Sequence, residues 1–370
     1  MIIDTDVHPA FASLTELLPW MDPAVRSYVT EGGAVLPIGN WFNVHGHLRG
    51  DAAPPNGGLP GTDVELMREQ LLDALDLEYA ILSVDYAWSA SAMAHPQLAA
   101  GIVTAANRWL IDTWLPLDKR FKGSVLVAIQ DPERAAEEIR SFGPHPDIVQ
   151  VLVPGASPTG YGDPRYRPIF EAAVEIGLPV TSHVAGEGAG INPAPTPIGY
   201  PFYYIEWHTL LPLCTMAQIV SLVCHGVFEA LPELKFGMLE CGLTWLPGLA
   251  WRLDDRWKAL RKEVPWVKQL PSETIRQHLF FGTQPLDEPR LGQQLRSVLE
   301  AFDGFGNMIM FASDYPHWDT DSPELVLDRL PAEWRDAVAS ENARTFYNLP
   351  PSPAGDGAVT GSARAGPNIA

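Results

Sequence analysis

Short apolar runs recur along the chain and alternate with amphipathic stretches. The runs have the length of β-strands and are almost continuously hydrophobic, as expected for parallel strands covered by helices. We expect strands at residues 2–6, 79–84, 123–128, 148–153, 179–183, 235–240, 279–281 and 307–312. Helical patterns lie between them, near residues 63–76, 97–115, 131–142, 165–176, 208–224, 243–260, 288–301 and 331–346. Strands that each precede a helix predict an α/β fold, a (β/α)8 TIM barrel.

Two long segments interrupt this alternation. Residues 10–61 follow the first strand and are rich in glycine, proline and histidine, and the glycine- and proline-rich residues 184–207 follow the fifth. Loops at the carboxyl ends of barrel strands usually build the active site. We therefore predict one barrel domain, residues 1–349, with insertions 10–61 and 184–207 at its site. The small, polar residues 350–370 are typical of a disordered tail.

The composition narrows the expected partners. The chain has 370 residues, a net charge of −20 and no cluster of lysine or arginine. Nucleic acids and anionic membrane surfaces both require a basic face, so we expect neither as a partner. The three cysteines form no CxxC motif, and the first residues do not resemble a signal peptide, which favours a cytoplasmic location. No stretch approaches about 18 uninterrupted apolar residues, so we expect no membrane span.

Metal-binding side chains stand at the ends of three predicted strands. The first strand ends in Asp6 and His8, which share a face because they are two residues apart. The fifth ends in His183 and the eighth in Asp314. Any one of these alone would more often be structural, but the strand ends of a barrel converge on one cavity. Because carboxylates and imidazoles bind borderline divalent metals, we expect the four residues to hold one metal ion.

These positions, with the run FASDYPHWD at 311–319 and the segment GVFEALPELK at 226–235, resemble the amidohydrolase superfamily. The chain is most similar to the branch with aminocarboxymuconate-semialdehyde decarboxylase and γ-resorcylate decarboxylase. This resemblance implies one divalent metal on Asp6, His8, His183 and Asp314, and a homodimer. The predicted fourth strand ends without a lysine to be carboxylated, which favours the one-metal branch over binuclear relatives. We expect Zn²⁺, with Mn²⁺ as the alternative because the extra carboxylate makes the site harder.

One position departs from the pattern of this branch. Relatives typically carry a histidine at the end of the sixth strand, where this chain has Glu240. A glutamate there would orient or deprotonate water, or protonate a carbon or a leaving group. The alternative is that Glu240 binds a loop arginine and does no chemistry. The catalytic candidates are Asp314, Glu240 and His208.

Four further residues are candidates for binding the small-molecule substrate. Arg252 resembles an arginine that in a relative reaches the substrate carboxylate in the neighbouring subunit. The alternative for Arg252 is an ion pair with Asp254 or Asp255. The other candidates are Arg49 in the first insertion, and Glu187 and Trp318, which closely follow predicted ligands.

Two reactions are compatible with this set of residues. The leading hypothesis is non-oxidative decarboxylation, a C–C lyase reaction, of a small aromatic or unsaturated carboxylic acid. The alternative is a metal-hydroxide hydrolase of an amide, ester, lactone or C–C bond. A non-catalytic barrel would need the ligand set to be vestigial, and all four ligand positions are filled.

Overall fold

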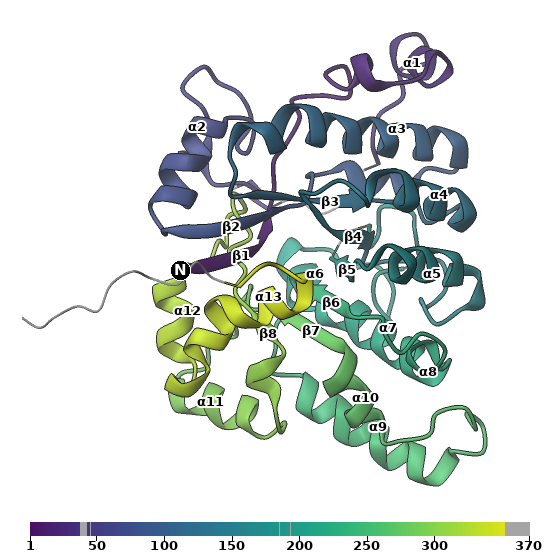
Figure 1. Cartoon of the computed structure of the whole chain (residues 1–370), viewed down its shortest axis with the longest axis vertical. Coiled ribbons are helices and arrows are strands. Elements are labelled where there is room, and N and C mark those ends of the chain that lie inside the picture. The colour runs from purple at the N-terminus through teal and green to yellow at the C-terminus, as the bar shows by residue number, and fades with distance from the viewer. Residues whose placement is uncertain (38–42, 45, 185, 193, 352–370) are drawn as a thin grey trace, which may run out of the picture.

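A computed structural model describes residues 1–37, 43, 44, 46–184, 186–192 and 194–351. Its eight parallel strands form one sheet whose order follows the chain (Figure 1). They are β1 (Ile2–Val7), β2 (Leu77–Leu82), β3 (Phe121–Leu126), β4 (Ile148–Pro154), β5 (Val180–His183), β6 (Phe236–Leu239), β7 (Leu279–Gly282) and β8 (Ile309–Met310). The last strand returns to the first, because the Thr5 N–H donates to the Phe311 carbonyl at 3.0 Å. The predicted (β/α)8 barrel is therefore confirmed.

Helices surround the sheet (Figure 1). They are α1 (Pro23–Thr30), α2 (Val64–Met67), α3 (Pro96–Trp109), α4 (Pro132–Phe142), α5 (Arg167–Ile176), α6 (Tyr204–Thr209), α7 (Pro212–Cys224), α8 (Val227–Ala230), α9 (Leu246–Leu260), α10 (Pro271–His278), α11 (Gly292–Glu300), α12 (Pro323–Arg329) and α13 (Asn342–Tyr347). Several begin as their sequence predicts. The Asp131 side chain accepts the Arg134 N–H at the start of α4, where Pro132 occupies the first turn.

Four helices, α1, α8, α10 and α12, lie outside the predicted ranges. They span only 8, 4, 8 and 7 residues, too few for an apolar periodicity to stand out against the surrounding loops. The predicted helix at 331–346 is also broken: a 3-10 turn and a π-turn precede α13. The hydrophobic pattern of the sequence was thus least informative about short helices and about where helices begin and end.

Helix α13 packs against the amino ends of the strands. Its Phe346 and Tyr347 share a buried cluster with Ile3 of β1. Lys235, which directly precedes β6, donates to the Thr345 carbonyl. A Cβ at Gly237 would lie 2.9 Å from the Phe346 ring, so a glycine is needed in β6 to admit this ring. The carboxyl ends of the strands are left for the site.

One stretch, Tyr204–Cys224, has the length and composition of a helix that could cross a membrane, and 33% of its most apolar window is buried. Its second half, α7, is one of the helices around the barrel. There Gln218 donates to the Gly155 carbonyl at 2.9 Å. The absence of a membrane partner stays a prediction.

Candidate metal centre

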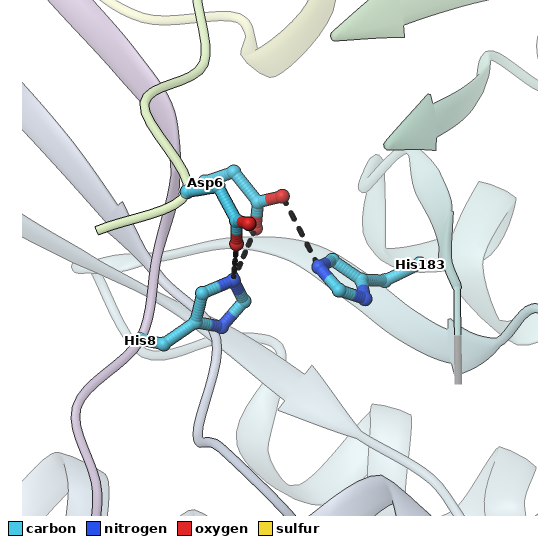
Figure 2. A group of neighbouring side chains, drawn as sticks. Asp6, His8 and His183 are labelled. Atoms are coloured by element: carbon cyan, nitrogen blue, oxygen red, sulfur yellow. Dashed lines mark ion pairs between the residues drawn. The ribbon is translucent and has the colours of Figure 1, made fainter. Parts of the chain in front are cut away.

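The four predicted metal ligands converge at the carboxyl ends of three strands. Asp6 lies in β1 and His8 follows it, His183 ends β5, and Asp314 lies beyond β8. Figure 2 shows the side chains of Asp6, His8 and His183 turned toward one another. All four side chains are buried, and one ligand atom from each lies within 4.8 Å of the others. The placement is as the strand-end pattern predicted.

The hydrogen bonds of the two histidines fit a metal ion. Nδ1 of His8 donates to the Ser83 carbonyl at 3.1 Å, and Nδ1 of His183 donates to the Val184 carbonyl at 2.8 Å. In its neutral form, each ring therefore presents the lone pair of Nε2 to the site, as a ligating histidine does.

The carboxylates face these lone pairs at short range. His8 Nε2 lies 2.9 Å from Asp314 Oδ1, and His183 Nε2 lies 3.2 Å from Asp6 Oδ2. Neither nitrogen has a hydrogen-bond partner, nor has either oxygen of Asp6. Lone pairs at such distances repel one another unless a cation lies among them. Two nitrogens and two carboxylates thus fit one divalent metal ion.

The pKa shifts of the site residues also indicate that the centre binds a cation. Burial alone would lower the pKa of His183, but the Asp6 and Glu240 carboxylates outweigh it and raise this pKa to about 10. Burial likewise opposes ionisation of Asp314, but His317 and His8 outweigh it and hold its pKa well below the usual range. The centre therefore has a negative potential that attracts a cation.

Aromatic rings fix the orientation of the ligands. Trp88, from a 3-10 turn (Ala87–Ala92) after β2, stacks on the His183 ring with centroids 4.8 Å apart and meets His8 edge-on at 5.4 Å. His317 stacks on His8 at 4.7 Å, and its Nδ1 donates to Asp314 Oδ1 at 2.6 Å. The sequence offered no signal for Trp88, because most aromatic residues simply pack in the core.

The backbone is unusual at two strand ends. Glu240 and Asp314 adopt left-handed conformations, with φ of 49° and 62°. Residues with a Cβ rarely adopt this region, and when they do they often belong to functional sites. Both lie directly at the centre.

A cavity of about 400 Å³ opens from the metal centre. Residues of both insertions contribute to its wall, including His47 from the first and Glu187 and Trp207 from the second. Aromatic side chains and carboxyl groups dominate the described lining, which includes Tyr86, Trp88, Tyr204, Trp207, Trp318, Asp85, Glu187, Glu240 and Asp319. No lysine or arginine is among the described lining residues. The cavity suits a flat molecule that carries no anionic group apart from one bound at the metal centre.

The catalytic candidates Glu240 and His208 lie beside the centre. Glu240 Oε2 is 3.6 Å from His183 Nε2, and no arginine pairs with it among the ion pairs of the described residues. Burial and the neighbouring Asp314 carboxylate raise the pKa of Glu240 well above its usual value. His208 Nε2 is 3.1 Å from Asp319 Oδ2. Asp319 was not among the predicted site residues, although it ends the run 311–319.

The substrate-binding candidates fall into two groups. Glu187 and Trp318 line the cavity. Arg49 instead pairs with Asp51 at 2.6 Å, and Arg252 is exposed on α9; neither is among the described lining residues.

Neither ion pair weighed for Arg252 forms in the described chain. Asp254 accepts hydrogen bonds from Ser272, and Asp255 pairs with Arg256 at 3.4 Å. The roles of all four candidates in substrate binding stay predictions.

Residues 3–349 match the family model described as Amidohydrolase. The chain belongs to the amidohydrolase family. Among curated relatives, γ-resorcylate decarboxylase of Rhodococcus jostii (strain RHA1) is 25% identical over 333 residues, which cover 79% of this chain and 93% of the relative. The family membership agrees with the resemblance that the motifs indicated.

Solved structures of amidohydrolase decarboxylases share the fold. The 5-carboxyvanillate decarboxylase of Sphingomonas paucimobilis has a TM-score of 0.65 and 21% identity, with 94% of this chain and 99% of that chain covered. The dihydroxybenzoic acid decarboxylase of Polaromonas sp. JS666, solved with manganese and 2-nitroresorcinol, has a TM-score of 0.63 and 20% identity, with 94% and 97% covered. A divalent metal is therefore consistent with both the ligand set and the fold.

Proposed function

We propose that this amidohydrolase is a metal-dependent, non-oxidative decarboxylase of a small aromatic or unsaturated carboxylic acid. The observation that carries the proposal is the convergence of Asp6, His8, His183 and Asp314 beside an aromatic-walled cavity, which His183 lines. Relatives named γ-resorcylate decarboxylase support the same class of reaction. A divalent ion held there would bind the substrate carboxylate and an adjacent oxygen and stabilise the charge that develops as the C–C bond breaks.

The protein groups supply orientation and the proton. Decarboxylation breaks the bond between the ring carbon and the carboxyl carbon, releases CO2 and places a proton on the ring carbon. Asp314 and His317, joined by their 2.6 Å hydrogen bond, can hold and move this proton, since His317 also lines the cavity. Trp88 and Trp318 offer flat surfaces that orient an aromatic ring.

The charge of the cavity restricts the substrate. A second carboxylate would meet Asp85 or Glu187 rather than a cationic side chain in the described lining. We therefore propose a monocarboxylic acid whose other substituents are neutral or basic.

Hydrolysis is the second candidate, and Glu240 favours it. A carboxyl group 3.6 Å from His183 Nε2 is placed to take a proton from an attacking water. Reaction in water enriched in oxygen-18 separates the two candidates. Hydrolysis places the label in the product, whereas decarboxylation exchanges only hydrogen at carbon.

The direct test is a panel of aromatic monocarboxylic acids assayed for CO2 release in deuterated water. The expected result is metal-dependent release with one deuterium on the ring carbon, lost in Asp314→Asn. No CO2 from any acid of the panel, with label from oxygen-18 water in a hydrolysed ester or lactone, would replace decarboxylation by hydrolysis.

The metal proposed for the centre is zinc or manganese. Two nitrogens suit zinc, and two carboxylates suit manganese, the ion present in the Polaromonas structure. Elemental analysis of protein purified without added metal decides between them.

We also propose a homodimer. Large apolar side chains are exposed on the second insertion and on α9, with Ile198 95%, Phe202 89% and Trp251 54% exposed. Exposed apolar side chains of this size support a subunit contact in which they become buried. Sedimentation analysis tests this, and a monomer at all concentrations would contradict it.

A further inference from the structure

A second group of potential metal ligands lies beside the first. It consists of His208 in α6, Glu240 after β6 and Asp319 in the loop after β8, and one ligand atom from each lies within 4.8 Å of the others. Three separate segments of the chain thus bring one imidazole and two carboxyl groups together, and Glu240 and Asp319 of this group line the cavity.

The contact between His208 and Asp319 has the same geometry as the contacts in the first centre. His208 Nε2 and Asp319 Oδ2 lie 3.1 Å apart, and both atoms are buried, yet neither has a hydrogen-bond partner. His183 Nε2 and Asp6 Oδ2 are 3.2 Å apart and also form no hydrogen bond. Buried polar atoms that lie this close and accept or donate no hydrogen bond can both be ligands of one cation.

The charge balance of the cavity also calls for another cation. An ion in the first centre would offset the charges of Asp6 and Asp314. The carboxyl groups of Asp85, Glu187, Glu240 and Asp319 remain in the cavity wall, and no lysine or arginine lines its described part. The residues outside the described ranges before residue 352 include neither of these types. Buried carboxylates without a cation are costly, which favours a ligand of positive charge between them.

We propose that His208, Glu240 and Asp319 bind a second divalent transition-metal ion next to the first. Glu240, whose Oε2 is 3.6 Å from His183 Nε2, lies between the two sites. One imidazole and two carboxylates suit zinc or manganese, and water completes the coordination because the side chains of His208 and Asp319 are 17% and 13% exposed. Only three protein ligands are available, so this site binds more weakly than the first.

This assignment gives Glu240 a specific role. The side chain at the end of β6 is then a direct ligand of the second ion. The proton of the reaction then remains with Asp314 and His317, which are hydrogen-bonded to each other. Binding of the second ion does not depend on which reaction the enzyme catalyses.

Metal stoichiometry tests the proposal. The full chain is freed of metal with a chelator and titrated with Mn²⁺, and free aqueous Mn²⁺ is followed by electron paramagnetic resonance. The expected result is two bound equivalents, the second weaker, with magnetic coupling between the two bound ions. Saturation at one equivalent would overturn the proposal.

Variants locate the second ion. Asp319→Asn and His208→Gln are each expected to weaken the second equivalent at least about tenfold, to abolish the coupling and to leave the first equivalent unchanged. Glu187→Gln removes a cavity carboxyl outside both groups and is the matched control, expected to keep two equivalents. If this control loses the second ion and the two ligand variants keep it, the ion is attracted by the charge of the cavity alone. That result would overturn the proposed site. Circular dichroism confirms folding, and the two independent ligand variants guard against one that fails to fold.

Discussion

Asp4 Oδ1 accepts a hydrogen bond from the backbone N–H of Ser313 at 2.9 Å. The same oxygen accepts the N–H of Asp6 at 3.2 Å. One buried carboxyl group in β1 thus joins the first strand to the end of the eighth, directly beside the metal ligands Asp6 and Asp314. The closure of the barrel and the geometry of the centre therefore depend on the same side chain.

Replacing Asp4 tests this connection. Burial raises the pKa of Asp4 to about 7, so an uncharged amide is a close mimic of its protonated form. Asp4→Asn keeps an acceptor oxygen and is expected to change the free energy of unfolding by less than about 1 kcal/mol. Asp4→Ala leaves two buried N–H groups without a partner and is expected to cost about 2–4 kcal/mol. Urea denaturation of both variants checks this, and equal stability of the alanine variant would contradict it.

Trp88 is expected to support metal binding without contacting the ion. Because its ring packs on both His183 and His8, Trp88→Ala frees two ligands to rotate. We expect metal affinity to fall about tenfold in Trp88→Ala and less in Trp88→Phe, as for other residues that orient ligands. Titration with Mn²⁺ measures this, and unchanged affinity in both variants would show that the backbone alone orients the ligands.

A buried ion pair between Glu78 and Arg344 attaches α13 to β2, with side chains 9% and 6% exposed. Glu78→Gln leaves the guanidinium buried without its counter-charge, so we expect a loss of about 3 kcal/mol in the free energy of unfolding. Glu341 is the matched control: it also contacts Arg344, at 3.4 Å, but is 62% exposed. Glu341→Gln is expected to cost no more than about 1 kcal/mol. Similar losses for the two variants in urea denaturation would contradict this assignment.

Glu138 of α4, which accepts hydrogen bonds from Thr104 and Asn107 of α3, is expected to make the stability of the protein depend on pH. Burial raises the pKa of Glu138, against the opposing hydrogen bonds from Asn107 and Thr104. The folded state therefore holds this proton more tightly than the unfolded state. Its stabilising effect is complete below the unfolded pKa and is lost as pH rises through the folded pKa.

The variant Glu138→Gln carries no titrating proton. We expect its stability relative to the parent protein to increase as pH rises from 4 to 8. Thermal unfolding of both proteins over this range measures the difference. A difference that is constant or that reverses with pH would show that Glu138 does not hold its proton.

The sequence was sufficient to predict the barrel and the convergence of the four candidate ligands. Continuous apolar strands have a recognisable length, and Asp6, His8, His183 and Asp314 each stand at a strand end, where the fold itself determines where the side chain lies. The short helices α1, α8, α10 and α12 were missed because they span about two turns or fewer. The cavity wall was harder to predict, since Trp88 and Asp319 reach it from loops whose course depends on tertiary packing.

The same limit applies to the arginines. Arg49 and Arg252 were chosen by position in the sequence and by resemblance, but the direction of a loop or surface side chain is set by its local partners. For Arg49 that partner is Asp51. Candidate functional residues at strand ends can thus be predicted from the sequence, whereas those in loops are much harder to predict.

We propose that Asp6, His8, His183 and Asp314 hold a divalent metal on which the reaction depends. The measurement that tests this is the metal content of the purified protein beside that of His183→Ala, each after reconstitution with one equivalent of zinc or manganese and removal of free ion. We expect about one tightly bound equivalent in the parent protein and its loss in the variant, with CO2 release lost in parallel. Parent protein that retains no metal, or a variant that retains it fully, would show that these residues do not hold the ion.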